Sequence, residues 1–207
     1  MTITAVKRDK NHTVKVDFDN AQSVRIDIDY RAVLCFHEGD TLTEEKLTEY
    51  LKESEYIRAK SRGMWFLDRA DHSEKSLYEK IVRGGISPGS AARAIARLKE
   101  LGMIDDVRYA ERLSQRMNES NISKREAYAK LISKGIPKQI VNEVLADTQF
   151  DESRQLAELI DKKYRLKLQT ENGVQKVYAA LVRKGFSYGA VRDAIKEYTK
   201  QELDGEF

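Results

Sequence analysis

The chain of 207 residues carries 37 basic and 34 acidic side chains, a formal net charge of +3, and 41% hydrophobic residues. This composition is typical of a soluble, folded protein rather than a disordered one, and the net charge is modest. The longest apolar run, Ala32 to Phe36, is far shorter than the roughly 18 residues of a membrane span, and the N-terminus lacks the apolar core of a signal peptide, so we expect a cytoplasmic protein.

Positive charge is spread unevenly along the chain. Residues 1–56 carry a net charge of −4 and residues 57–104 a net +5, whereas residues 105–150 and 151–207 carry +1 each. A basic segment behind an acidic start predicts an anionic partner for part of the surface.

The first 36 residues alternate between apolar and polar side chains, which is the period of a β-strand. Residues 14–18 and 24–29 form two such runs around a turn sequence and predict an antiparallel hairpin. We expect a third strand at residues 3–6 and a candidate fourth at residues 33–36. The single cysteine, Cys35, lies in this last apolar run, which favours a buried side chain over a reactive thiol.

After Gly39 the pattern changes to that of a helix. Thr43 is a suitable N-cap, and Glu44 and Glu45 suit the positive end of the helix dipole. The helix is expected to continue through Leu51, and a break before residue 57 is left open.

Three similar windows then follow at intervals of 50 residues. They read LYEKIVRGGI at 77–86, AYAKLISKGI at 127–136 and VYAALVRKGF at 177–186. Three matches at one period indicate stacked units that each leave an apolar face for a neighbour. Around them we expect nine helices, at residues 56–69, 73–84, 88–101, 105–118, 123–134, 137–147, 151–167, 172–184 and 188–200.

The repeated glycines, Gly85, Gly135 and Gly185, stand where a helix ends in the left-handed conformation that glycine adopts without a Cβ penalty. The apolar residue after each glycine can cover the preceding turn and also begin the next helix. A serine then serves as N-cap in the first and third units, whereas Pro137 leaves the second unit without a side-chain cap.

These patterns predict a mostly α-helical fold, a tandem array of three three-helix repeats preceded by a small antiparallel β-rich N-terminal domain. The period breaks near Gln169, which predicts a longer first helix or connection in the third repeat. The expected domains are 1–55 for the strands and first helix, 56–103, 104–150 and 151–200 for the repeats, and 201–207 for a short tail.

The sequence carries no recognisable motif for catalysis or metal binding. The three histidines lie in different segments, without Cys or carboxylate neighbours at metal-ligand spacing: His12, His37 and His72. We therefore expect no metal and no cofactor. Four acids in the strand region fit the solvent face of a sheet better than a cation site: Asp17, Asp19, Asp27 and Asp29.

Aromatic residues recur at matching places of the units. Tyr78, Tyr128 and Tyr178 could stack on bases, but their recurrence favours packing between helices, since each repeat must rebuild the same core. Trp65, with Phe66, is likewise expected in the core of the first unit.

Rows of arginine are the strongest candidates for a binding surface. Arg93 and Arg97 recur four residues apart on one predicted helix, and a second row follows on the next. Arginine binds phosphates and carboxylates in a bidentate manner, so DNA or protein could be the partner. The alternative is an ordinary solvated face. The candidate contacts are Arg83, Arg93, Arg97, Arg108, Arg112 and Arg116.

The stretch from Ala94 to Ala110, AIARLKELGMIDDVRYA, resembles the junction motif of the RecX family of bacterial recombination regulators. The windows LYEKIVRGGIS, AYAKLISKGIP and VYAALVRKGFS resemble that family's three tandem repeats, over about residues 57–200. The N-terminal segment, with GDTLTEEKLTEYLKESE, resembles the extension of the longer members, which is typical of Gram-positive bacteria.

The resemblance implies a non-enzymatic regulator of homologous recombination, DNA repair and the SOS response. Such a protein binds the RecA recombinase and its filament on single-stranded DNA. It modulates the filament's ATPase, strand-exchange and coprotease activities, with inhibition as the expected direction. Single-stranded or double-stranded DNA is a further candidate partner, no membrane is expected, and a monomer is the expected state.

Two other functions stay open. A stand-alone DNA-binding protein could place helix-turn-helix-like units in a groove, and it would bind DNA strongly and salt-dependently without a recombinase. An enzyme with an unrecognised site would need a convergent cluster of titratable groups.

Overall fold

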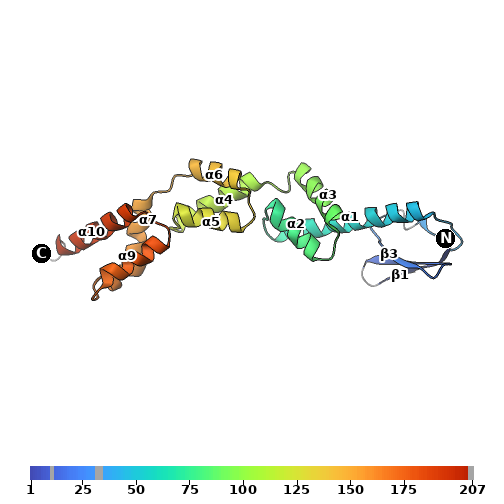
Figure 1. The fold of residues 1–207 in the computed structure, drawn as a ribbon, viewed down its shortest axis with the longest axis horizontal. Helices are drawn as coiled ribbons and strands as arrows, with labels where there is room; N and C mark the ends of the chain where they lie inside the picture. The colour runs from blue at the N-terminus through green and yellow to red at the C-terminus, as the bar shows by residue number, and fades with distance from the viewer. Residues whose placement is uncertain (10–11, 31–34, 205–207) are drawn as a thin grey trace. The chain divides into compact units, whose positions relative to one another are not determined.

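A computed structural model describes residues 1–9, 12–30 and 35–204 of the chain, with side chains as far as residue 200 (Figure 1). The chain forms two compact units, Met1–Asp105 and Asp106–Phe207. Within the described residues, no helix is long and apolar enough to cross a membrane.

The N-terminal strands form the expected antiparallel sheet. Strands β1 (Ile3–Arg8), β2 (Thr13–Phe18) and β3 (Ser23–Asp27) lie in the order β1-β2-β3. Val16 pairs with Val24 across the hairpin, so the apolar positions of both strands share one face. Of the candidate fourth strand, Val33 and Leu34 lie outside the described residues, and the two residues after them are not in a strand.

Helix α1 (Glu44–Arg69) covers the sheet and continues into the first repeat. Thr43 Oγ1 accepts a hydrogen bond from the Lys46 N–H at 3.3 Å and caps the helix as expected. Leu47 joins the sheet core near one end of α1, whereas Ala59 joins the core of the first repeat. No break interrupts the helix before Ile57.

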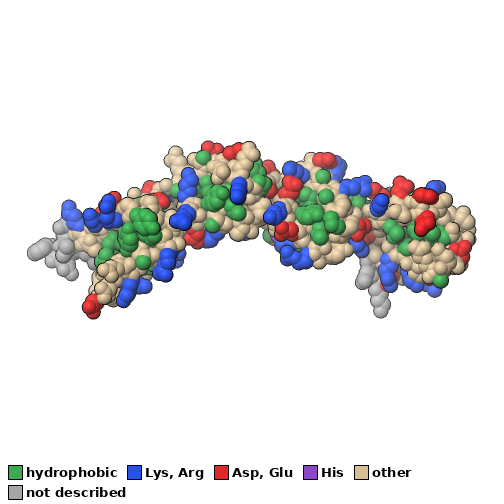
Figure 2. All heavy atoms as spheres, viewed as in Figure 1, with side chains coloured by type: hydrophobic (Ala, Val, Ile, Leu, Met, Phe, Trp, Pro, Cys, Tyr) green, Lys and Arg blue, Asp and Glu red, His purple; other side chains and the backbone are tan. Residues whose placement is uncertain are grey.

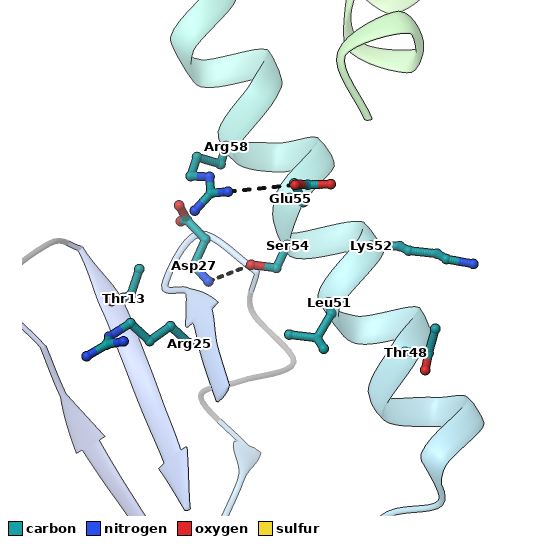
Figure 3. A pocket seen from close by; sticks show the side chains of 9 residues that line it. All are labelled: Thr13, Arg25, Asp27, Thr48, Leu51, Lys52, Ser54, Glu55 and Arg58. Atoms are coloured by element: carbon teal, nitrogen blue, oxygen red, sulfur yellow. Dashed lines mark hydrogen bonds and ion pairs between the residues drawn. The ribbon is translucent and has the colours of Figure 1, made fainter. Parts of the chain in front are cut away.

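Two expectations for the strand region were wrong. Cys35 is exposed, because Phe36 takes the inward position of the apolar run and the cysteine beside it faces outward. Asp27 is buried at 9% exposure, because α1 packs over the end of β3. Its backbone N–H donates to Ser54 Oγ at 2.6 Å (Figure 3). Its carboxylate accepts a hydrogen bond from the Asp29 N–H at 3.0 Å.

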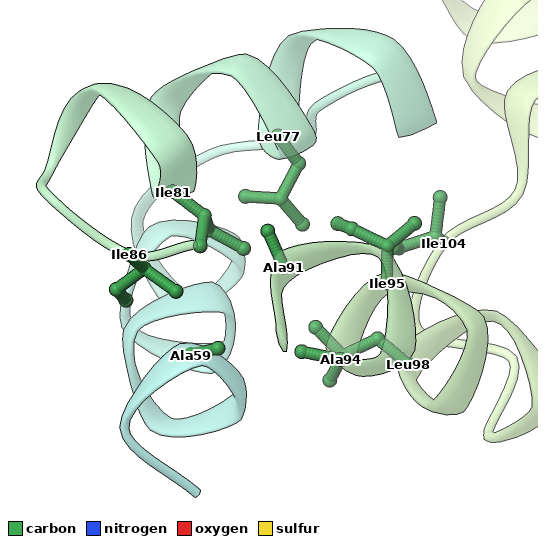
Figure 4. Close-up of a cluster of buried hydrophobic side chains, with 9 residues drawn as sticks. All are labelled: Ala59, Leu77, Ile81, Ile86, Ala91, Ala94, Ile95, Leu98 and Ile104. Carbon is green, nitrogen blue, oxygen red and sulfur yellow. The ribbon is translucent and has the colours of Figure 1, made fainter. Parts of the chain in front are cut away.

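The first repeat is completed by α2 (Glu74–Arg83) and α3 (Pro88–Glu100). Gly63 of α1 lets α3 approach closely, since a Cβ there would lie 2.6 Å from Leu98 Cδ1. The core brings together three helices and the residues that follow α2 and α3, as Figure 4 shows. Its buried members are Ala59, Leu77, Ile81, Ile86, Ala91, Ala94, Ile95, Leu98 and Ile104.

Trp65 does not lie in this core, so that expectation was wrong. Its side chain is 51% exposed, and the Arg69 guanidinium stacks 3.6 Å above the ring centroid. Phe66, the next residue, turns inward and packs partly against the core. A helix turns by about 100° per residue, so neighbouring aromatics on α1 face different environments.

The second repeat contains α4 (Asp106–Glu119), α5 (Lys124–Ser133) and α6 (Lys138–Asp147). Ser123 caps α5, while Pro137 precedes α6 without a side-chain cap, as the sequence predicts.

The third repeat begins with one long helical segment. It consists of α7 (Glu152–Leu159), the π-helix η2 (Ile160–Tyr164) and α8 (Arg165–Leu168), and is followed by α9 (Gly173–Arg183) and α10 (Tyr188–Asp204). The longer first helix of this repeat is therefore confirmed. Part of its extra length lies in the π-helix, a wider turn that accommodates additional residues.

Within the described parts of the chain there are nine helices, counting α7, η2 and α8 as one, and the mostly α fold class is confirmed. The buried positions recur every 50 residues, as the similar sequence windows do. The glycines that end the second helices have φ values of 83°, 84° and 91° at Gly85, Gly135 and Gly185. Matching core positions are fully or almost fully buried: Leu77, Ala127 and Val177; Ile81, Leu131 and Leu181; Ile86, Ile136 and Phe186.

Candidate functional site

In the first unit, the arginines of α3 are engaged with acidic residues. Arg93 donates from Nη1 to Glu53 of α1, and its guanidinium lies 4.1 Å from the Tyr56 ring centroid. The hydrogen bond to Glu53 raises the pKa of Arg93 above its ordinary value. Arg93 therefore joins α3 to α1 as well as presenting charge.

For the other two candidate arginines of the first repeat, Arg97 and Arg83, no ion pair or hydrogen bond among the described residues joins one helix to another as Arg93 joins α3 to α1. Arg97 Nη1 lies 2.9 Å from Glu100 Oε2 on the same helix, with both side chains at least half exposed. Such exposed pairs contribute little to stability and exchange partners easily. Arg83 is exposed in the last turn of α2.

In the second repeat, α4 carries three arginines spaced four residues apart. Arg108 and Arg116 are exposed, and Arg112 between them is half-buried. The opposite face of α4 enters the core through Ala110 and Met117. The spacing of four residues places the three arginines along one side of the helix, as a row of fixed positive charge.

The repeated tyrosines pack against the repeats' cores. Tyr78, Tyr128 and Tyr178 are each half-buried against the hydrophobic cluster of their own repeat. This placement fits the packing role that their recurrence favours.

A second polar arrangement connects the first and third helices of a repeat. Glu55 of α1 accepts hydrogen bonds from the Ser87 N–H at 3.1 Å, from the Ser87 hydroxyl, and from Ser90 Oγ at 2.7 Å. Partial burial acts to raise the pKa of Glu55, but the serine hydrogen bonds outweigh it, and the net pKa is below the ordinary value. In the third repeat, Glu152 accepts from Ser187 Oγ at 2.8 Å in the same manner.

A pocket of about 290 Å³ lies between the hairpin and α1 (Figure 3). Arg25, Lys52 and Arg58 line it together with Asp27 and Glu55. The two signs of charge are mixed at this pocket, which gives it no clear preference for an anion or a cation.

The approach of His12 to two of the strand-region acids was not predicted from the sequence. His12 Nε2 lies 3.2 Å from Asp29 Oδ1, and these two groups and the Asp27 carboxylate all fall within 4.8 Å of one another. The hairpin brings together residues 15 or more positions apart, which local spacing does not reveal. Pairing of His12 with Asp29 accounts for their approach, and the absence of a metal site stays a prediction.

The chain resembles proteins of one family along nearly its whole length. Residues 151–195 match the model of the third three-helix domain of RecX. A regulatory protein RecX of Clostridium perfringens strain 13 is 29% identical over 211 residues, covering 97% of this chain and 96% of the relative. One from Caldanaerobacter subterraneus is 26% identical, covering 94% of this chain and 98% of the relative.

Solved structures show the same fold. A crystal structure of a regulatory protein RecX matches with a TM-score of 0.67 at 21% identity, covering 95% of this chain and 98% of that one. RecX from Lactobacillus salivarius matches with a TM-score of 0.61 at 22% identity, covering 69% of this chain and 96% of that one. With its helices in repeats, its three-stranded sheet and relatives along almost its whole length, the chain is similar to the RecX family of regulatory proteins.

Proposed function

We propose that this protein is a non-enzymatic regulator of the RecA recombinase, acting in the cytoplasm as a monomer. It binds the RecA filament on single-stranded DNA and inhibits its ATPase, strand-exchange and coprotease activities, and so regulates homologous recombination and DNA repair. The observation that carries the proposal is similarity along nearly the whole chain to proteins named regulatory protein RecX.

The architecture supports a binding role. The same positions are buried in each repeat, and proteins built of such repeats commonly bind large partners. We propose that the chain is divided into an N-terminal domain, three repeats and a short tail. Their bounds are 1–55, 56–103, 104–150, 151–200 and 201–207. We propose the six arginines named above as contacts to the acidic groups of the filament.

The direct experiment measures ATP hydrolysis by RecA on single-stranded DNA while this protein is titrated. We expect hydrolysis to fall as the protein approaches the concentration of RecA. An unchanged rate in excess protein would contradict the proposal.

A double variant that reverses two charges on α4 tests whether this helix contacts the RecA filament. Arg108→Glu with Arg116→Glu is expected to raise the concentration for half-inhibition about tenfold, because two favourable charge contacts become repulsive. The matched control is Lys163→Glu with Lys176→Glu, which makes the same charge change at two other exposed positions. Equal losses in both pairs would remove the α4 row from the binding surface.

Stand-alone DNA binding is the competing function. Strong binding through phosphate contacts releases counterions and so falls steeply with salt. The modest net charge of +3 argues against it. Titration of labelled single-stranded and double-stranded DNA without RecA decides between the two, because tight, salt-dependent binding with no effect on RecA would favour the DNA-binding function.

A further inference from the structure

A groove with a volume of about 550 Å³ lies in the second compact unit, between helices α5 and α6 and the glycine turn that joins α9 to α10. Its floor is apolar. Leu145 and Phe186 are 3% and 4% exposed and belong to two neighbouring hydrophobic clusters, while Tyr128 and Val182 are half-buried beside them. The groove therefore lies where the cores of the second and third repeats meet.

The rim of this groove is positively charged. Lys124 and Arg125, the first two residues of α5, have neither an ion pair nor a hydrogen bond from their side chains to any residue that the structure describes. Two acids lie nearby: Glu126 pairs with Lys130 at 2.8 Å, and Glu152, which also lines the groove, accepts a hydrogen bond from Ser187 at 2.8 Å. Two cations thus remain available to an acidic group.

An exposed aromatic side chain stands on the same rim. Tyr188, the first residue of α10, is 70% exposed and lines the groove. The positions 50 and 100 residues earlier hold Lys138 and Pro88, so this tyrosine is not needed to build a repeat. Large exposed aromatic residues beside an apolar depression are typical of protein interaction sites.

Contacts between the repeats fix the groove's geometry. Ser123 Oγ donates to the carbonyl oxygen of Lys184 at 2.5 Å, which joins the start of α5 to the glycine turn. Gly185 makes this approach possible, because a Cβ there would lie 2.7 Å from Ser123 Oγ and 3.0 Å from Arg125 Cβ. The turn holds Arg125 at the groove's edge.

The cationic rim is particular to the second repeat. The positions that match Lys124 and Arg125 hold Glu74 and Lys75 in the first repeat. The third repeat has the neutral Val174 and Gln175 there. Figure 2 shows apolar side chains gathered in separate patches over the helical part of the chain, with both basic and acidic side chains around them.

We propose that this groove is a docking site for an acidic segment of a partner protein that inserts an apolar side chain. The floor accepts the apolar side chain, Tyr188 covers it, and Lys124 and Arg125 bind the flanking carboxylates. Nucleic acid fits less well, because two cations release few counterions and phosphates gain nothing from an apolar floor. This proposal does not depend on the proposed regulation of RecA.

The test uses the full chain and fluorescent peptides of twelve residues in which Asp and Glu flank a Leu-Phe pair. We expect saturable binding by anisotropy. Replacing Leu-Phe by Ser-Ser in the peptide, or Asp and Glu by Lys, should weaken it at least tenfold. Lys124→Glu with Arg125→Glu, and separately Tyr188→Ala, should also weaken it at least tenfold, whereas Lys163→Glu with Lys176→Glu should change it less than twofold.

Thermal unfolding by circular dichroism checks that the variants fold. Tyr188 is exposed, so Tyr188→Ala keeps the test decisive if the double reversal fails to fold. The proposal is overturned if no peptide saturates or if the control pair weakens binding equally. It is also overturned if single-stranded oligo(dT) binds more tightly than the acidic peptide and is lost with the same substitutions. RecA is absent from the assay, so failure here and failure of the proposed function are distinguishable.

Discussion

The first and third repeats share their buried positions and differ in what they expose. Leu77 and Val177 occupy matching, fully buried places. On the outer side of the third helices, however, Arg93 and Arg97 of α3 are matched by Asp193 and Glu197 of α10. Packing restricts the inside of a repeat to apolar residues of suitable size, while the exposed side can change charge without loss of the fold.

Their first helices differ as well. In the first repeat α1 is one continuous helix that crosses α3 closely at Gly63. In the third repeat the corresponding helix contains the π-helical turn Ile160–Tyr164. The same three-helix unit therefore tolerates two solutions for its first helix, provided that the side chains facing the second and third helices stay buried.

The third repeat should be the more sensitive to an added methyl group. Gly173→Ala is expected to destabilise it by about 3 kcal/mol, because the new Cβ would overlap the Lys167 carbonyl oxygen, which is backbone and cannot rotate away. Hydrogen exchange of the α9 amides measures this locally. Gly189→Ala is the control, since a Cβ there meets nothing within 4 Å, and it should be neutral or slightly stabilising.

An added methyl group at a close helix contact of the first repeat should cost less. Gly63→Ala is expected to destabilise by about 1–2 kcal/mol, because its Cβ meets the end of the Leu98 side chain, which can move in part. Adding Leu98→Val, which removes the contacting methyl, should recover some of the loss. Urea unfolding of the single and double variants checks this, and full additivity of the two losses would contradict the crossing described here.

One substitution gives the third helix of the first repeat the charge found at the matching position of the third repeat. Arg97→Glu gives α3 the residue that α10 carries at Glu197, and we expect a threefold to tenfold weaker inhibition of RecA ATPase. Lys196→Glu on α10 is the control with the same charge change. If both variants inhibit like the unchanged protein, the difference in surface charge has no part in this function.

The smallest effect concerns acid stability of the third repeat. Hydrogen bonds from Asn121, Lys162 and Arg154 lower the pKa of Glu158 from 4.5 to about 2. A lowered carboxyl pKa stabilises the fold above the unfolded value of 4.5, and this contribution is lost as pH falls towards 2. Glu158→Gln should therefore flatten the decline in stability between pH 4.5 and 2. Parallel declines in both proteins would show that Glu158 is not responsible.

Periodic features could be predicted because they depend on local chemistry. Gly135 ends a helix by backbone conformation alone, and Ser123 and Thr43 cap helices through bonds to residues three positions ahead. The hairpin was predicted from two runs of alternating apolar and polar residues on either side of a turn sequence. All of these signals lie within a few residues along the chain.

The errors occurred where distant segments decide the outcome. Asp27 looked exposed because strand alternation says nothing of α1 packing over the end of β3. Trp65 looked buried because an aromatic run does not tell which residue faces the core. The proposed arginine rows were visible in the sequence, but Arg93's contact with Glu53 depends on a helix crossing across 40 positions. The groove at Tyr188 likewise requires two repeats to meet.

The continuity of α1 has a mechanical consequence. One helix contributes Leu47 to the sheet core, Ala59 to the repeat core, and the Glu55 carboxylate that binds the start of α3. Because no loop interrupts α1 between these contacts, a rotation of the sheet about the axis of α1 would also rotate the part of α1 that packs against α3.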